Sequence, residues 1–313
     1  MISVVLCTYN GEKYIKEQIE SIITQTIQPD EIIICDDNSN DNTIAICEEI
    51  LRTTNIRFKI FRNLKNLGVI KNFEKGIKCC TGDIVFTCDQ DDYWYENKIE
   101  KMMPFFRDAE CKLVFSNAYL VDKNRKKLNC NLWDSLYFKP ENISTYNKCF
   151  DLLLKHCIVT GAAMAFRKDI FLDIIPFPDC WIHDGWIAIN ACIRGKIVAV
   201  NENLIDYRQH GNNVIGVSIE KRYKGFSYNK YKWLQRYKVF LERNSKKLDE
   251  RSKKKLKGCI LFWSDLCRID HVNLIHGLVI LLKNLMNLRL FKYGNGIRCI
   301  YTEIKNKMMN GCK

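Results

Sequence analysis

The chain has 313 residues, of which 47% are hydrophobic and 27% are charged, so it is long and apolar enough to bury a sizeable core. This composition excludes a disordered or fibrous protein. The net charge of +13 is unevenly placed: residues 220–313 hold 23 Lys and Arg against 7 Asp and Glu, whereas residues 1–219 hold 26 against 29. We therefore expect a domain over residues 1–219 and a basic region over residues 220–313.

Strands and helices alternate over the first 108 residues. Apolar, β-rich runs predict strands at residues 2–10, 31–37, 56–63 and 82–92. Apolar residues at helical spacing predict helices at residues 12–26, 42–54, 70–80 and 96–108. This alternation predicts an α/β fold, a Rossmann-like and mostly parallel sheet flanked by helices, in which ligands bind beyond the carboxyl ends of the strands. Neither GxGxxG nor GxxxxGK[ST] occurs, which disfavours a dinucleotide fold and a P-loop.

The pattern is less regular from residue 110 onward. A strand is predicted at residues 111–122, and the basic, Asn-rich stretch after it, up to residue 150, is predicted as loop. A helix, a Gly-containing turn, a strand and a short helix are predicted within residues 152–178, and another helix within 181–196. A strand from residue 197 then leads into a polar loop, and the chain beyond residue 220 is helical and Lys-rich.

The 16 cysteines form no Cys-x-x-Cys pair, and many lie inside apolar runs, as Cys7, Cys35 and Cys88 do. They therefore resemble small core residues more than a disulfide framework. The opening residues MISVVLCTYN lack the basic segment of a secretory signal. We expect a reduced, cytoplasmic setting.

Two carboxylates, Asp36 and Asp37, end the predicted strand at residues 31–37. A carboxylate at a strand end is well placed to accept a hydrogen bond from a nucleobase or from a ribose hydroxyl. The alternative is a helix N-cap or an Asx-turn. Ser39, Asn40 or Asp41 can serve that alternative alone, which leaves the two aspartates before them unexplained.

Three carboxylates crowd the stretch from Asp89 to Asp92. Carboxylates that are this close raise each other's pKa. Because Asp89 and Asp91 are two residues apart on an extended segment, they point the same way and can bind a hard divalent cation together with phosphate oxygens. A bound cation would also remove the repulsion. The alternative is an exposed acidic turn, which the apolar flanks disfavour.

Asp184 follows His183 and lies between Trp181 and Trp186. Aromatic surroundings can hold the pKa of an aspartate high enough for it to act as a base. The alternative is that Asp184 caps the helix that follows it. Further along, Arg208 and the residues up to the Gly-containing stretch at 211–213 predict either a loop that closes over phosphates or an ordinary solvated turn.

These motifs, in this order, resemble the family 2 glycosyltransferases with the GT-A fold. The stretches VVLCTYNGEKYI, IIICDDNSNDNT, NLGVIKNFEKGI and TCDQDDYW match the pattern of that family. The later stretches TGAAMAFRK, WIHDGW and YRQHGNN resemble its rhamnosyltransferase-like members in particular. The resemblance covers roughly residues 1–215, and the basic region then forms a C-terminal helical extension.

The resemblance implies a role for each matched position. It implies that the nucleotide is bound by Thr8, Tyr9, Asn10, Glu12, Asp36, Asp37, Asn66, Asn72, Asp89 and Gln90, with Asp37 at the base. It implies a site for Mn²⁺ or Mg²⁺ at Asp89, Asp91 and His210. It implies that the catalytic base is Asp184, and that the acceptor or the diphosphate is bound by Asp92, Trp94, Gly161, His183, Trp186 and Arg208. The family often has an acidic residue where this chain has His183, so the role of His183 stays open.

The implied reaction is an inverting transfer of a sugar from a dTDP- or UDP-linked donor to a glycan or lipid-linked acceptor, in cell-surface polysaccharide synthesis. Rhamnose is the preferred sugar, and galactose, glucose or an N-acetylhexosamine remain alternatives, because pocket shape and few contacts decide sugar identity. A non-catalytic nucleotide-sugar or glycan-binding protein is a further alternative. Asp89, Asp91 and Asp184 argue against it, since a binding module needs no base.

The basic region contains an amphipathic helical pattern. Its apolar face consists of Ile275, Leu278, Val279, Leu282, Leu285 and Met286. A basic amphipathic helix suits an anionic membrane surface, here the inner face of the cytoplasmic membrane. The alternative is a helical subdomain that packs this face against the catalytic domain. A nucleic-acid partner is disfavoured, because no recognised motif accompanies the basic charge.

Overall fold

The computed structural model describes residues 1–210, 229–289 and 293. The chain forms two compact units, Met1–Tyr223 and Lys224–Lys313. The expected boundary between residues 219 and 220, and the loop expected after His210, lie outside the described residues.

Among the described residues of the first unit, nine strands form one sheet. The order is β3-β2-β1-β4-β8-β6-β9-β5, and β7 pairs with β6. These strands are β1 (Ile2–Thr8), β2 (Glu31–Asp36), β3 (Arg57–Arg62), β4 (Ile84–Asp89), β5 (Tyr93–Trp94), β6 (Cys111–Val121), β7 (Lys127–Asn131), β8 (Met164–Arg167) and β9 (Lys196–Arg208). Strands β3, β2, β1 and β4 are parallel, whereas β8 is antiparallel to both β4 and β6.

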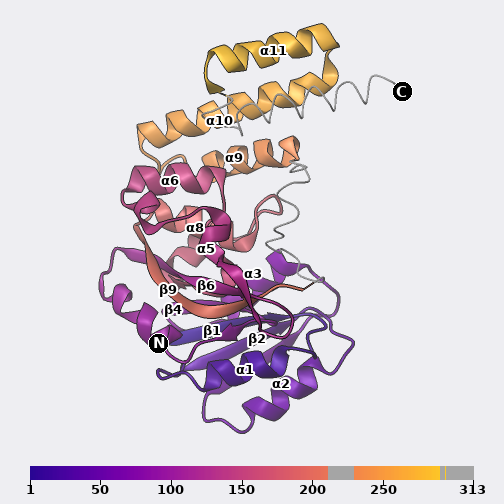
Figure 1. Cartoon of the computed structure of the whole chain (residues 1–313), viewed down its shortest axis with the longest axis vertical. Coiled ribbons are helices and arrows are strands. Elements are labelled where there is room, and N and C mark those ends of the chain that lie inside the picture. The colour runs from indigo at the N-terminus through magenta and orange to yellow at the C-terminus, as the bar shows by residue number, and fades with distance from the viewer. Residues whose placement is uncertain (211–228, 290–292, 294–313) are drawn as a thin grey trace. The chain divides into compact units, whose positions relative to one another are not determined.

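The strand order places a ligand site between β1 and β4. The helices α1 (Ile15–Ile23) and α2 (Thr43–Leu51) carry the chain from β1 to β2 and β3, and α3 (Val69–Cys79) returns it to β4 on the other side of β1. Because such crossovers are right-handed, α1 and α2 cover one face of the sheet and α3 covers the other (Figure 1). Ligands bind where the direction of the strand order reverses.

The register brings three strand ends side by side. Thr8 of β1 pairs with Asp36 of β2, and Cys7 pairs with Asp89 of β4. Strand β1 is buried along its whole length, as expected for a central parallel strand with an unbroken apolar run. The polar residues that follow β1, β2 and β4 therefore emerge at one edge of the sheet.

The stretch between residues 123 and 150 differs from the expected loop. It contains β7, α5 (Leu132–Leu136) and the start of α6 (Tyr146–Lys155). Strand β7 is largely exposed, and its five residues, KLNCN, alternate between polar and apolar side chains over too short a stretch to stand out from a loop, so its pairing with β6 is only weakly signalled in the sequence. The remaining α-helices in the described part of the first unit are α4 (Lys98–Met102), α7 (Phe171–Ile174) and α8 (His183–Cys192).

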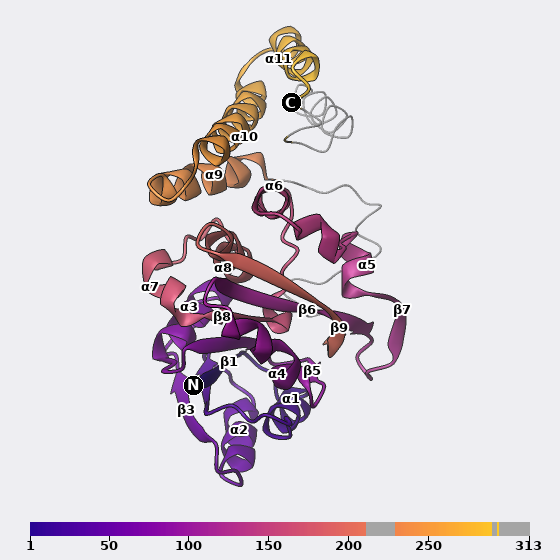
Figure 2. The same ribbon diagram turned by 90° about the vertical axis from the view of Figure 1, so that its left-hand side faces the viewer.

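The second unit contains the helices α9 (Lys230–Asn244), α10 (Glu250–Arg268) and α11 (Leu274–Met286), shown together in Figure 2. Each begins after an Asn or Asp whose side chain accepts a hydrogen bond from the first turn: Asn229, Asp249 and Asn273. The α/β fold class and the helical C-terminal region are confirmed. Within residues 1–210 and 229–289, no helix has both the length and the apolar character that crossing a bilayer requires.

Candidate active site

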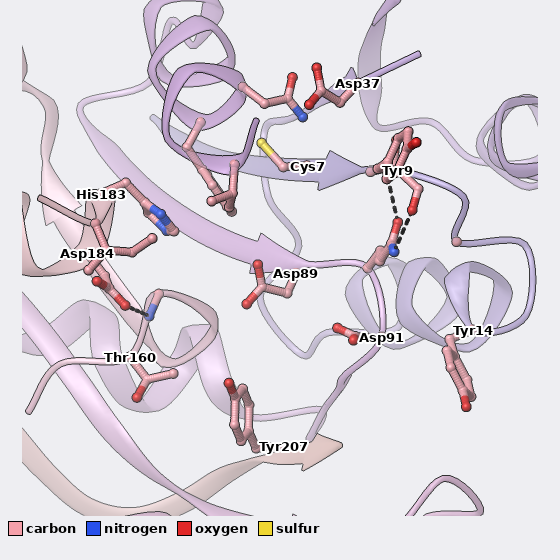
Figure 3. A pocket seen from close by; sticks show the side chains of 18 of the residues that line it. Cys7, Tyr9, Tyr14, Asp37, Asp89, Asp91, Thr160, His183, Asp184 and Tyr207 are labelled. Atoms are coloured by element: carbon pink, nitrogen blue, oxygen red, sulfur yellow. Dashed lines mark hydrogen bonds between the residues drawn. The ribbon is translucent and has the colours of Figure 1, made fainter. Parts of the chain in front are cut away.

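A cleft of about 950 Å³ lies beyond the carboxyl ends of β1 and β4. Figure 3 shows the side chains that meet there from separate elements: Tyr9 after β1, Asp37 after β2, Asp89 and Asp91 at the end of β4, and Asp184 on α8. The other expected site residues that line the cleft are Thr8, Asn10, Asn66, Asn72, Gln90, Gly161, His183 and His210. The cleft therefore gathers residues from both ends of the first unit's sequence.

Asp37 anchors the loop that leads into α3. Its buried carboxylate accepts hydrogen bonds from the backbone N–H groups of Leu67, at 2.7 Å, and Gly68, at 2.8 Å, and from Asn63 Nδ2 at 2.8 Å. Gly68 has a φ of +81°, a conformation that glycine adopts at little cost. These bonds hold Asn66, which precedes the helix, at the wall of the cleft.

Asp36 and Glu12 do not line the cleft. Asp36 is buried and accepts hydrogen bonds from Thr8 Oγ1 and from the backbone N–H of Ser39, both at 2.9 Å. Glu12 accepts a hydrogen bond from the backbone N–H of Asn42 at 3.0 Å. The turn-forming alternative thus describes the contacts of Asp36, whereas Asp37 faces the cleft.

Gln90 joins the ends of β1 and β4. Its Oε1 accepts a hydrogen bond from the backbone N–H of Tyr9 at 2.8 Å, and its Nε2 donates one to the carbonyl of Tyr9 at 3.0 Å (Figure 3). This two-way pairing fixes the segment between Asp89 and Asp91. The two carboxylates on either side of Gln90 can then face the cleft together.

In the acidic segment, residues 89–92, the ionised forms of Asp89 and Asp92 are disfavoured. Asp89 is only partly exposed, and its desolvation, with the charges of Asp91 and Asp184, raises its pKa to about 7. Asp92 is buried beneath the cleft, where desolvation raises its pKa well above the usual range, and it accepts a hydrogen bond from the backbone N–H of Arg208 at 2.9 Å. Asp91 Oδ2 lies 2.7 Å from His210 Nε2.

Lys98 is a fully buried lysine near this segment, and no motif in the sequence singles it out. Its Nζ donates a hydrogen bond to the carbonyl of Ala162 at 2.7 Å and lies 3.5 Å from the ring centre of Trp94. Desolvation lowers its pKa to about 7, against the opposing effect of Cys88, Asp92 and Asp89. In its protonated form Lys98 supplies positive charge near Asp89 and Asp92, and burial shifts the loss of that proton down towards neutral pH.

Three of the expected site residues are structural supports outside the cleft lining. Arg208 is buried and donates hydrogen bonds to the carbonyl of Asp91 at 2.7 Å and to Glu17 Oε2 at 2.6 Å. Trp94 and Trp186 are also buried, and Trp186 Nε1 donates to the carbonyl of Ile174 at 2.9 Å. Arg208 thus holds the backbone of the acidic segment in place.

Asp184 lies in the first turn of α8, whose N-cap is Ile182, so it does not cap the helix. Its Oδ2 accepts a hydrogen bond from the backbone N–H of Gly161 at 3.2 Å (Figure 3). Cys157 Sγ lies 3.5 Å from its other carboxylate oxygen. The carboxylate is thus held at the cleft by the turn at residues 161–163, and Lys98 holds the same turn through Ala162.

Several residues that line the cleft were not expected from the sequence. They are Cys7, Tyr14, Phe73, Cys157, Thr160 and Tyr207, among others. Most belong to apolar or mixed runs in which core and cleft positions look alike. In the part of the chain that the structure describes, no cluster of three or more His, Cys, Asp and Glu side chains has the geometry to hold a metal ion.

The chain has an α/β fold of the GT-A type, with a largely parallel sheet and a cleft at its switch point. Its structural neighbours are glycosyltransferases with the same fold. A family model described as "Glycosyl transferase family 2" matches residues 3–174. The chain belongs to glycosyltransferase family 2.

The curated relatives are named as transferases of different sugars. The chain is 30% identical over 241 residues to the dTDP-rhamnosyl transferase RfbG of Shigella flexneri, covering 74% of this chain and 81% of that protein. It is 27% identical to an uncharacterised glycosyltransferase of Nostoc sp., covering 68% of this chain and 66% of the relative. It is also 25% identical to the glucosyltransferase WfgD of Escherichia coli, over 64% and 73% of the two chains.

Solved structures share the fold at low sequence identity. TarS of S. aureus, residues 1–349 in complex with UDP-GlcNAc, is 18% identical with a TM-score of 0.60, covering 84% of this chain and 72% of that one. The mannosyltransferase PcManGT of Pyrobaculum calidifontis, in complex with GDP-Man and Mn²⁺, is 16% identical with a TM-score of 0.53, covering 98% and 84%. At these identities the likeness concerns the fold.

Proposed function

We propose that the chain transfers a sugar from a nucleotide-diphosphate donor to an acceptor hydroxyl, with inversion at the anomeric carbon and Asp184 as the base. One observation carries this proposal: Asp89, Asp91 and Asp184 face the same cleft at the switch point of the sheet. The catalytic machinery then belongs to residues 1–219. Residues 220–313 form an accessory region.

The nucleotide binds at the carboxyl ends of β1 and β2 in this proposal. Thr8, Tyr9, Asp37 and Asn66 line that side of the cleft, and Asp37 keeps its proposed contact with the base while it anchors the loop before α3. The UDP-GlcNAc in the TarS complex and the GDP-Man in the PcManGT complex support a nucleotide-sugar donor.

Mn²⁺ or Mg²⁺ fits the chemistry of the acidic segment. Asp89 and Asp91 would hold it through their carboxylate oxygens, with His210 beside Asp91 as the third proposed ligand. Because these three side chains do not form a ready metal cluster in the described part of the chain, oxygens of the donor diphosphate would have to complete the site. Burial, and after it the charges of Asp91 and Asp184, raises the pKa of Asp89, and a cation bound beside it would favour the ionised carboxylate again. When bound, the cation supplies charge stabilisation for the departing diphosphate. The Mn²⁺ in the PcManGT complex supports this assignment.

The proposed displacement is a single step. Asp184 takes the proton of the acceptor hydroxyl while the hydroxyl oxygen forms a bond to the anomeric carbon. The bond from that carbon to the phosphate oxygen breaks on the opposite face, and its electron pair leaves with the nucleoside diphosphate. The hydrogen bond from Gly161 orients the carboxylate of Asp184 for this task.

Rhamnose remains the preferred sugar, and cell-surface polysaccharide synthesis the preferred process. The similarity to RfbG, named as a dTDP-rhamnosyl transferase, supports the choice of sugar. The similarity to WfgD, named as a glucosyltransferase that acts on a diphosphoundecaprenol-linked acceptor, favours glucose as the second candidate and supports a lipid-linked acceptor.

We further propose that the second unit contacts the inner face of the cytoplasmic membrane. Ile275, Val279, Leu282 and Met286 follow each other at helical spacing on α11 and are 56–83% exposed. Lys253, Lys254, Lys255 and Lys257 add positive charge on α10. An exposed apolar stripe with basic residues suits an anionic lipid surface.

A donor-cleavage assay tests the proposed function. The purified chain is mixed with dTDP-rhamnose, UDP-glucose or UDP-N-acetylglucosamine, MnCl₂ and a GlcNAc-diphosphate-lipid acceptor of the kind named for WfgD, and the released nucleoside diphosphate is measured. We expect one donor to be cleaved, and we expect EDTA or Asp91→Asn to reduce the rate by about 10²-fold or more. Release from none of these donors would contradict the proposal, and release that EDTA leaves unchanged would remove the cation from it.

A further inference from the structure

His183 is a buried polar side chain whose hydrogen-bonding groups are unused. It opens α8, one residue before Asp184, and is 4% exposed. Neither ring nitrogen has a hydrogen-bond partner among the residues that the structure describes. Desolvation lowers the pKa of the imidazole below 6.5, although Asp184 opposes this, so the neutral ring offers one donor and one acceptor at pH 7.

The ring is fixed on two sides. It stacks on Phe73 of α3, with 3.9 Å between the ring centres and 16° between the planes. On another side is Gly161, where a Cβ atom would lie only 2.7 Å from Nε2. The imidazole edge therefore occupies the space that a side chain at residue 161 would take, and His183 lines the cleft (Figure 3).

The position of His183 lies between the nucleotide side of the cleft and the base. Phe73, on which the ring stacks, comes from α3, the helix that also brings Asn72 to the cleft. Asp184 is the next residue along the chain. In the proposed reaction the transferred sugar lies between the nucleotide and the base. Both nitrogens are shielded from solvent in this structure, with Nε2 against Gly161, so a hydroxyl reaches one of them only when the turn at residues 161–163 gives way as the sugar binds. A hydroxyl both donates and accepts hydrogen bonds, so it then satisfies either nitrogen of a neutral imidazole.

We propose that His183 hydrogen-bonds a hydroxyl group of the transferred sugar and thereby selects among donor sugars; this inference rests on the proposed glycosyl transfer. A polar group that a substrate hydroxyl satisfies, and that an analogue without that hydroxyl leaves unpaired, discriminates strongly. His183 is then a specificity-determining residue, and Asp184 remains the base.

Calorimetry on the full chain with MnCl₂ tests this inference. The ligands are dTDP-rhamnose, UDP-glucose and UDP-N-acetylglucosamine, with dTDP and UDP as controls that lack a sugar. For His183→Ala we expect affinity for the sugar nucleotide that the native chain binds to fall roughly five- to thirtyfold, because one hydrogen bond is lost. Affinity for the matching nucleoside diphosphate should change by less than about twofold.

Two conservative variants guard against a folding defect. His183→Gln places an amide near the position of Nε2, and His183→Asn places one near Nδ1, so one of them should recover most of the lost affinity. Equal losses for the sugar nucleotide and the nucleoside diphosphate, or no loss in His183→Ala, would overturn the inference. If the native chain binds the nucleoside diphosphates but no sugar nucleotide, the proposed function fails as well.

Discussion

At the scale of single residues, the cleft makes the ionised form of Asp89 unfavourable. It is only partly exposed and lies near Asp91 and Asp184, so its pKa rises to about 7, while Lys98 acts in the opposite direction. An unfolded aspartate has a pKa of about 3.9. Between these two pH values the folded protein binds more protons than the unfolded chain. The free energy of unfolding therefore decreases as the pH rises from about 4 to about 7.

We predict that Asp89→Asn makes the metal-free protein less sensitive to pH. The slope of the free energy of unfolding against pH should flatten by at most about 1.4 kcal/mol per pH unit in this window, which corresponds to one proton. Urea denaturation in EDTA at pH 4.5, 5.5, 6.5 and 7.5 measures the slope. An unchanged slope in the variant would show that Asp89 titrates normally.

At the scale of elements, α4 and the turn at residues 161–163 form one support for the site. Lys98, the first residue of α4, holds Ala162, and Gly161 in the same turn holds Asp184. Thr87 of β4 donates a second hydrogen bond to this turn, at the carbonyl of Gly161. The position of the proposed base thus depends on a helix that has no residue in the lining of the cleft.

We predict that Lys98→Met, which keeps the length of the side chain and removes its charge, reduces donor cleavage by about tenfold, because the turn that holds Asp184 loses its tie to α4. The free energy of unfolding should fall by less than the roughly 1–3 kcal/mol of a lost buried hydrogen bond, because the variant also removes the desolvation cost of the lysine. The carbonyl of Ala162 loses its partner, and the carboxylates lose a nearby cation. The control is Lys101→Met on the same helix, because Lys101 is exposed and should change stability by less than about 0.5 kcal/mol. Equal effects of the two variants would contradict this role of Lys98.

At the scale of the whole molecule, the two units separate catalysis from attachment in our proposal. We predict that the chain binds vesicles that contain anionic phosphatidylglycerol more tightly than vesicles of phosphatidylcholine. Leu282→Glu should weaken this binding about tenfold or more, since it places a charge in the apolar stripe of α11. Asn287→Glu adds the same charge at another exposed residue of the chain and should cost less. Vesicle flotation measures the binding of both variants. Equal losses of binding in the two variants would mean that the added negative charge, and not the apolar stripe of α11, explains the effect.

The sequence predicted the parts of the fold and site that depend on short, regular patterns. Parallel strands that end in polar residues place Asp89 and Asp91 at the edge of the cleft. Right-handed crossovers between such strands then bring β1 and β4 side by side. The choice between Asp36 and Asp37 needed the structure, because both follow the same strand and only the loop before α3 decides which one faces the cleft. Lys98 was missed because its hydrogen-bond partner, the carbonyl of Ala162, lies 64 residues further along the chain, and no local pattern encodes such a contact.

The most direct test of the account is the rate of sugar transfer by Asp184→Asn, with the donor that the cleavage assay identifies. The account predicts that kcat falls by about 10²–10⁴-fold, with little change in the affinity for the donor, because the amide cannot accept the proton of the acceptor. Asp179→Asn, at an exposed carboxylate on the same unit, is the matched control and should retain full activity. Full activity of Asp184→Asn would contradict the account.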